Sequence, residues 1–198
     1  MTMAPTRIEH DSLGPCEVPT DALYGVRTAR IVEHLSFSRR TLGSCPEYVA
    51  AIALVKRAAA RANGTARVLA SDLVAAIEAA TEFLPTAELA PHLPADILGG
   101  GGAIGININV NEVLANLANE TLGGCRGVYA PVDPRQHVNA SQSTADVCHA
   151  AARLAVIRGW PPLAAALARA GDAFDAFLAR EGRDIAVAAL HSFALGAT

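Results

Sequence analysis

Charged side chains are scarce in this sequence. Asp, Glu, Lys and Arg make up 18% of its 198 residues, whereas about a quarter of a typical soluble chain is charged. So few charges cannot cover the whole surface, and one explanation is that part of it is buried against another subunit. The formal net charge is −3 and the basic residues are scattered, so there is no electrostatic basis for binding nucleic acid.

Long apolar runs are also missing, so no segment is predicted to span a membrane. The first ten residues, MTMAPTRIEH, lack the hydrophobic stretch of a secretory signal. The four cysteines (Cys16, Cys45, Cys125 and Cys148) lie far apart with no C-x-x-C pair, which favours free thiols over disulfides. Together these absences predict a cytoplasmic protein.

Motifs of common metal, phosphate and nucleophile sites are absent as well. The six histidines form no H-x-x-x-H or H-x-x-E pair, and there is no G-x-S-x-G or G-K-[ST], so no metal site is predicted. A literal G-x-G-x-x-G does occur at Gly100, Gly102 and Gly105. It follows HLPADIL, which is too short and proline-broken for the strand that a dinucleotide site needs. We interpret it as a glycine-rich loop and predict no cofactor.

Helical patterns dominate the rest of the chain, and little strand is expected. The predicted helices cover residues 44–64, 71–84, 111–124 and 143–159, with a fifth opened by the proline pair 161–162. Ser44 and Glu47 have the spacing of a capping box at the first of them. The fifth carries an apolar stripe made of Leu163, Leu167, Ala170, Phe174, Phe177 and Leu178. Residues 7–45, which proline and glycine interrupt, are expected to be irregular.

Two polar stretches have the composition of a binding site. GGGGAIGININVNEVLAN (Gly99 to Asn116) alternates like a strand but ends like a helix, and its asparagines suit either turns or ligands. In HVNASQSTADV, Ser141, Ser143 and Thr144 cluster at a predicted helix start, where free N–H groups favour an anion. Simple N-capping by Ser141 or Ser143 explains the cluster equally well. The residues alone leave both interpretations open.

Four blocks of the sequence, in this order and at this spacing, resemble the aspartase and class II fumarase family. They are RIEHDSLGPCEVPTDALYGVRTARIVEHLSFS (7–38), VKRAAARAN (55–63), NINVNEVLANLANETLGG (107–124) and HVNASQSTADV (137–147). The resemblance implies a mainly α chain, with a small irregular or helical N-terminal domain followed by the first helices of a truncated helical bundle. We expect the first domain to cover residues 1–135 and the start of the bundle to cover residues 136–198.

The resemblance also implies an activity. Family members are homotetramers that reversibly eliminate ammonia or water from a C4 dicarboxylate without a cofactor, in active sites built from three subunits. Matched residue by residue, Asn107, Ser143 and Thr144 fall on substrate-binding positions. No catalytic residue is carried over, because the family's serine-bearing loop with the general base has no counterpart before the chain ends.

Other family positions are changed. The hydroxyl residues ahead of Asn107 fall on Ile104, Gly105 and Ile106, and a family asparagine falls on Ala145. Asp184 stands at a family threonine position, where it would repel a dicarboxylate. A methyl group cannot donate a hydrogen bond to a substrate charge, and an unpaired buried charge is costly.

Three functional hypotheses follow from these matches and changes. The first is a subunit, inactive alone, that joins a longer family-like chain to form or regulate a lyase for an amino or hydroxy dicarboxylate. The second is a stand-alone pseudoenzyme with a binding, scaffold or regulatory role. The third is a lyase with a remodelled, less anionic pocket. Because the three hypotheses differ on this point, whether the chain is an enzyme stays open. A homo- or hetero-oligomer that binds a small dicarboxylate is expected.

Overall fold

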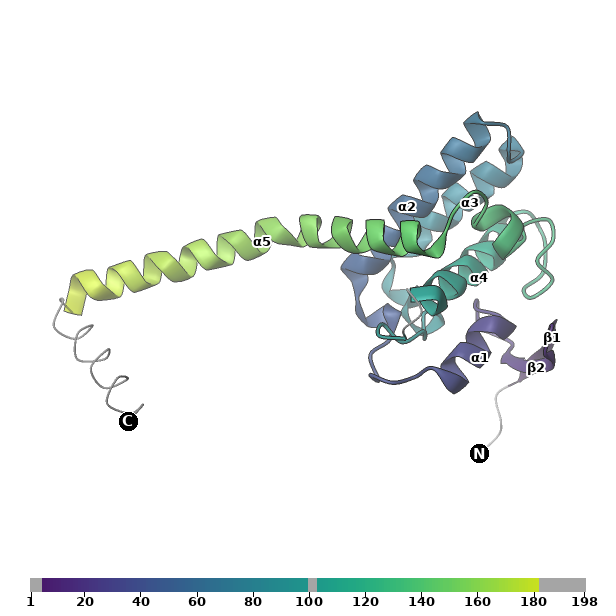
Figure 1. The fold of residues 1–198 in the computed structure, drawn as a ribbon, viewed down its shortest axis with the longest axis horizontal. Coiled ribbons are helices and arrows are strands. Elements are labelled where there is room, and N and C mark those ends of the chain that lie inside the picture. The colour runs from purple at the N-terminus through teal and green to yellow at the C-terminus, as the bar shows by residue number, and fades with distance from the viewer. Residues whose placement is uncertain (1–4, 100–102, 182–198) are drawn as a thin grey trace. The chain divides into compact units, whose positions relative to one another are not determined.

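The computed structural model describes residues 5–99 and 103–181 (Figure 1). The chain divides into two compact units, Met1–Ala155 and Val156–Thr198. The helices are α1 (Val26–His34), α2 (Pro46–Thr65), α3 (Ser71–Phe83), α4 (Ile104–Thr121) and α5 (Thr144–Glu181). Shorter turns are the 3-10 helices η1 (Leu42–Ser44) and η2 (Ala87–His92) and the π-helix η4 (Pro134–Val138). The prediction of a mainly α chain is confirmed.

A two-stranded antiparallel hairpin corrects the expectation that residues 7–45 are irregular. Strand β1 (Thr6–Asp11) pairs with β2 (Gly14–Pro19), and Asp11 lies opposite Gly14 across the turn. Gly14 has a φ of +105°, which favours glycine at that position. The buried residue of β1 is Glu9 rather than an apolar side chain. The strand therefore lacks the apolar alternation by which a half-buried strand is predicted.

Two predicted helix boundaries are wrong. No side chain caps α2, whose N-cap is Cys45, because the Ser44 hydroxyl donates to the Thr41 carbonyl within η1. The expected capping box therefore does not form. Pro161 and Pro162 lie inside α5 instead of opening a separate helix. Proline removes an N–H donor, but its fixed φ near −65° is itself helical, so the proline pair did not have to mark a boundary.

The core of the first unit lies between α2, α3 and α4 (Figure 1). Its largest fully buried apolar side chains include Leu42, Ile52, Ile77, Leu84 and Leu114. Helix α4 is buried along most of its length, and its start at Ile104 is earlier than the sequence pattern predicted. Helix α1 packs on α4 and on the hairpin, so α4 joins the core to the N-terminal segment.

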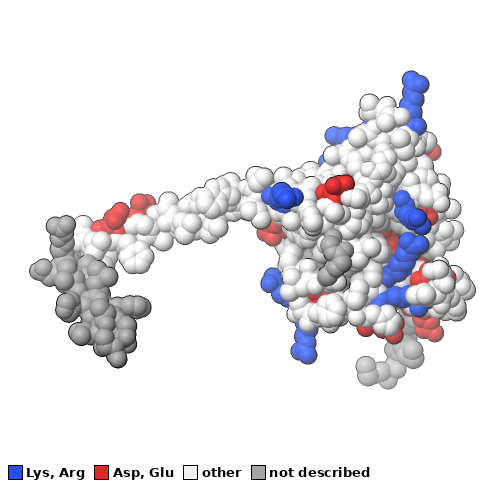
Figure 2. Space-filling view, viewed as in Figure 1, with Lys and Arg blue, Asp and Glu red and all other residues white. Residues whose placement is uncertain are grey.

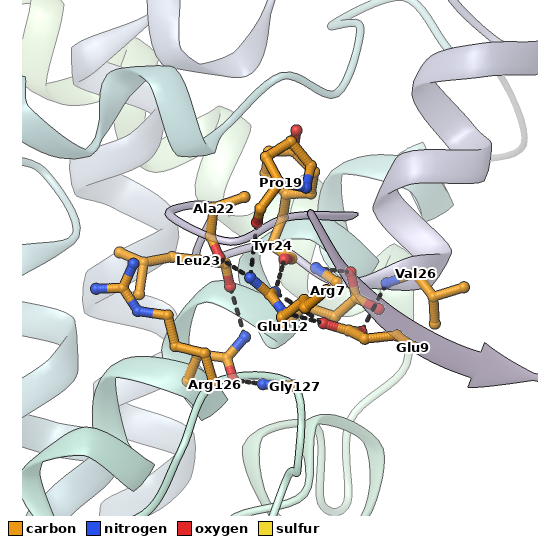
Figure 3. A network of polar contacts seen from close by, with 12 residues as sticks. Arg7, Glu9, Pro19, Ala22, Leu23, Tyr24, Val26, Glu112, Arg126 and Gly127 are labelled. Carbon is orange, nitrogen blue, oxygen red and sulfur yellow. Dashed lines mark hydrogen bonds and ion pairs between the residues drawn. The ribbon is translucent and has the colours of Figure 1, made fainter. Parts of the chain in front are cut away.

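A buried carboxylate joins α1 to α4 (Figure 3). Glu112 of α4 accepts hydrogen bonds from the backbone N–H groups of Gly25, Arg27 and Thr28 and from the Thr28 hydroxyl. Burial raises the pKa of Glu112, and these hydrogen bonds oppose the rise. The N–H groups belong to the first turn of α1, where an acidic group is favoured. Glu112 therefore fixes the position of α1 on α4.

A second buried acid and an arginine hold the hairpin against the same turn (Figure 3). Glu9 of β1 accepts from the Val26 N–H at 2.9 Å and pairs with Arg7. The Arg7 guanidinium also donates to the carbonyls of Pro19, Thr20, Ala22 and Tyr24. The donors of Arg7 are directed to backbone and carboxylate oxygens, so the buried Glu9 and the part-buried Arg7 both have partners.

In the second unit, the described residues 156–181 are helical and strongly apolar at the surface. Side chains more than half exposed are Val156, Ile157, Trp160, Leu163, Leu167 and Phe174. Charged side chains are few over this helix (Figure 2). A contiguous exposed apolar stripe is typical of an interaction surface. Among residues 5–99 and 103–181, no helix has the length and apolarity needed to cross a bilayer.

Replacing Glu112 by Gln is expected to lower the free energy of unfolding by about 2–3 kcal/mol, because buried N–H donors lose a charged acceptor. Urea unfolding of the full chain measures the change. Glu120→Gln is the matched control on the same helix: Glu120 pairs with Arg126 at the surface, and such a pair is worth at most about 1 kcal/mol. Equal losses in the two variants would contradict the role given to Glu112.

Candidate functional site

A cleft of about 220 Å³ lies where α1, α4, η4 and the start of α5 meet. Its lining residues are Arg27, Ile104, Asn107, Ile108, Asn111, Pro134, Arg135, Asn139 and Thr144. The cleft therefore combines two cations, three amides and a hydroxyl with an apolar side formed by the isoleucines and Pro134. Small polar ligands are bound in clefts with a few convergent polar groups of this kind.

Asn139 is the centre of the polar side of the cleft. Its Oδ1 atom accepts from Lys56 Nζ at 2.9 Å, from Asn107 Nδ2 at 3.0 Å and from Asn111 Nδ2 at 3.3 Å. Its Nδ2 atom donates to the Gln142 carbonyl at 3.0 Å. Three elements, α2, α4 and the loop before α5, thus converge on one side chain.

Thr144 is linked to this centre through Asn107. Asn107 Nδ2 donates to Thr144 Oγ1 at 3.0 Å, so the threonine oxygen acts as the acceptor. No acceptor among the described residues takes the hydroxyl proton of Thr144, which therefore remains available to a ligand in the cleft. The guanidinium groups of Arg27 and Arg135 likewise form no hydrogen bond or ion pair within the described chain. The cleft can thus offer a hydroxyl and two cations to a carboxylate.

Some acceptors beside the cleft have no partner. Asn107 Oδ1, Asn111 Oδ1 and Gln142 Oε1 are buried without a hydrogen bond to any described residue. Buried polar groups in native proteins are generally paired, and an exception calls for an explanation. Here all three exceptions lie within the one network around Asn139.

Lys56 is the charged group that sequence reasoning missed. Its side chain is 1% exposed, and burial lowers its pKa to about 7, against a smaller opposing effect of Cys148. Burial raises the pKa of the Cys148 thiol. The helical spacing of α2 could have revealed it, because this spacing places Lys56 on the buried face of the helix, together with Ile52, Ala60 and Asn63. A lysine at a core position is unusual enough to be noticed from the sequence.

The loop before α5 is held at several points. Asn63 Nδ2 donates to the Ala140 carbonyl at 2.9 Å, and Gln142 Nε2 donates to the carbonyls of Val138 and Ala140. Ser141 has a φ of +57°, a left-handed conformation that costs energy outside glycine. These contacts keep the loop in the conformation that presents Asn139 and Thr144.

The structure brings together two of the three predicted substrate residues. Asn107 and Thr144 line the cleft and are hydrogen-bonded to each other. Ser143 is exposed and does not line the cleft. Its hydroxyl donates to Asp146 Oδ2 at 2.7 Å and accepts from the Asp146 N–H at 3.1 Å. This is the N-capping arrangement that the sequence left open for Ser143.

The changed family positions fall in different surroundings. Ile104 lines the cleft and is 47% exposed, whereas Ile106 is buried in the core. Ala145 is exposed. Asp184 and the first two glycines of the G-x-G-x-x-G lie outside the described residues. No group of three or more His, Cys, Asp or Glu in the described part of the chain could hold a metal ion, and the four cysteines are free thiols.

Comparison with known proteins matches residues 14–187 to a lyase family. The chain is 40% identical over 151 residues to the aspartate ammonia-lyase of Escherichia coli K12, covering 76% of the chain and 32% of that protein. It is 44% identical to a fumarate lyase:delta crystallin structure from Brucella melitensis, with a TM-score of 0.74, covering 77% and 33% of the two chains.

A class II fumarase structure from Schistosoma mansoni is 32% identical, with a TM-score of 0.70, and the match covers 77% of this chain and 32% of that one. The chain spans about a third of the length of these relatives. Their N-terminal portion is the part that it matches.

The pKa of Lys56 makes the stability of the chain dependent on pH. A lysine has an ordinary pKa of 10.5 but about 7 in this fold, so between these values the unfolded chain binds one more proton. The free energy of unfolding should therefore rise with pH in this window, by up to about 1.4 kcal/mol per pH unit.

The measurement is the difference in unfolding free energy between the wild type and Lys56→Met at several pH values. Subtracting the variant removes the contribution of other titrating groups. A difference that stays flat from about pH 7 to pH 10 would contradict the lowered pKa.

Proposed function

Because this chain belongs to the lyase family of aspartases and class II fumarases, we propose that it is a subunit providing part of a lyase site. A longer family-like chain would complete the site. The reaction is the reversible elimination of ammonia or water from an amino or hydroxy dicarboxylate, without a cofactor. The four free thiols agree with action in the cytoplasm.

The observation that carries this proposal is the juxtaposition of Thr144 and Asn107 with Arg27 and Arg135 around one cleft. A carboxylate binds best where a hydroxyl or N–H donor and a guanidinium converge in a partly dry site. Ser143, which the family resemblance also assigns to substrate binding, would contribute only if its bond to Asp146 opened in the assembled site.

The lining of the cleft also explains why the chain is proposed to be inactive alone. Elimination requires a general base to remove a proton next to the carboxylate. No carboxylate, histidine, cysteine or lysine is among the residues that line the cleft in the described part of the chain. Binding groups are present there without a base, so the base would come from the partner.

The partner would dock on the second unit. Its apolar surface residues, among them Trp160, Leu167 and Phe174, are more than half exposed, and removing such side chains from water favours association. A longer family-like chain or further copies of this chain would supply the covering helices.

A second candidate function is supported by the apolar side of the cleft. Ile104 and Ile108 line it, and neither can donate a hydrogen bond to a second carboxylate. This favours a lyase with a less anionic substrate than a C4 dicarboxylate. Comparing monocarboxylate with dicarboxylate binding to the same cleft separates the two candidates.

The purified chain is expected to form no fumarate from aspartate or malate, as measured by ultraviolet absorbance against a no-protein control. Fumarate formation by the chain alone would contradict the incomplete site.

Co-purification from the native host with mass spectrometry is expected to identify a longer family-like chain. Absence of any partner would favour the stand-alone pseudoenzyme.

In the complex, Thr144→Ala should reduce kcat/KM by about a hundredfold, because it removes one donor to the substrate carboxylate. Thr121→Ala is the matched control: Thr121 is exposed at the end of α4, with its hydroxyl bonded to the Leu117 carbonyl. Unchanged activity in Thr144→Ala would remove this cleft from the active site and leave a scaffold role.

A further inference from the structure

We infer that Lys56 is a positioning residue: through Asn139 it orients Asn107 and Thr144 so that the Thr144 hydroxyl donates into the cleft. The identification of the ligand that accepts this hydrogen bond as a carboxylate rests on the proposed function. The orientation itself rests on the contacts of Lys56, which lies on α2 and does not line the cleft.

The first step is the orientation of Asn139. An ammonium group has N–H donors and no acceptor, so Lys56 Nζ can pair with the Oδ1 atom of Asn139 but not with its Nδ2 atom. The other end of the amide agrees, because Nδ2 donates to the Gln142 carbonyl at 3.0 Å. Lys56 and the Gln142 carbonyl therefore select one of the two amide orientations.

The second step is the effect of the Asn139 orientation on the side chains that line the cleft. Once Asn139 presents Oδ1, both Asn107 and Asn111 must turn their Nδ2 atoms toward it. Asn107 Nδ2 then also reaches Thr144 Oγ1, so the threonine oxygen is used as an acceptor. Its proton is left for a ligand. If the side-chain amide of Asn107 were turned so that Oδ1 faced Thr144, the Thr144 hydroxyl would donate to Asn107. Its proton would then not be available to a ligand in the cleft.

The backbone of this region does not depend on Lys56. Asn63 Nδ2 donates to the Ala140 carbonyl, and the Tyr48 hydroxyl donates to the Cys148 carbonyl at 3.2 Å. These two α2 side chains attach the loop and the start of α5. Lys56 instead contacts a side chain, Asn139, so its specific effect is on hydrogen-bond direction.

The network also has an energetic cost that a purely structural role does not explain. Lys56 is almost fully buried with one hydrogen bond, and Asn107 Oδ1 and Asn111 Oδ1 are unpaired. An apolar side chain of similar volume at position 56 would avoid the cost of removing an amine from water.

The protonation state of Lys56 determines how strongly one orientation of the Asn139 side-chain amide is preferred. A neutral amine can accept as well as donate, so the orientation of Asn139 is less strongly selected when the proton is lost. The titratable groups around Lys56 are the Cys148 thiol on α5, whose charge acts on it, and the Tyr48 phenol, which is bonded to the Cys148 carbonyl. The transition is expected near pH 7.

The test follows the side-chain amide resonances of Asn107 and Asn139 in the full chain by NMR between about pH 6 and pH 9. We expect both to shift together with a common midpoint in the wild type and in the control Thr65→Ala, and to stop shifting in Lys56→Met. Resonances that do not move in the wild type, or that move equally in Lys56→Met, would overturn the inference. If Lys56→Met does not fold, the wild-type titration decides.

A second readout uses succinate as the carboxylate probe. Lys56→Met should weaken its binding by about tenfold at pH 6. Thr65→Ala is the control on the same helix: Thr65 is exposed with its hydroxyl bonded to the Arg61 carbonyl, and its replacement should change succinate binding less than about twofold. Equal weakening in both variants would overturn the specific role of Lys56. Failure of the wild type to bind succinate would count against the proposed function, while the amide titration would still decide the role of Lys56.

Discussion

The carboxylate of Glu112 is the contact on which the arrangement of the cleft depends. It lies inside the protein and accepts the free N–H groups at the start of α1, which would otherwise be buried without partners. The same bonds fix Arg27, one of the two cations of the cleft, relative to Asn107 and Asn111 on α4. A helix terminus that needs an acceptor and an acid that needs donors thus stabilise each other and position the site.

The asparagines of α4 divide into structural and site residues by their hydrogen bonds. Asn109, Asn116 and Asn119 are 0% exposed, and each both donates and accepts, to bind the loops around η2, the segment before α1 and the segment before η4. Asn107 and Asn111 instead keep an unpaired oxygen and line the cleft. The asparagines of one stretch thus hold loops at one set of positions and line the cleft at another.

Scarcity of charge has a different consequence in each unit. In the first unit a few charged groups, Glu9, Lys56 and Glu112, are buried with partners that fix loops and helix ends. In the second unit the described helix has apolar side chains on its surface. Exposed apolar area of this kind is removed from water by association, which is the physical basis for the proposed partner.

The sequence by itself determined that the chain is mainly α and to which family it belongs, because helical periodicity and the order and spacing of motifs can be read along the chain. It did not show that Asn107 and Thr144 are hydrogen-bonded to each other. It did not reveal the hairpin, since β1 buries Glu9 instead of an apolar residue, or the direction of the hydrogen bonds that reach Thr144. Those depend on Lys56, 83 residues before Asn139 in the chain, and on Glu112. Only the tertiary structure brings such distant groups together. The burial of a charged side chain and the partners that it finds depend on residues far away in the sequence, so neither can be read from the local pattern.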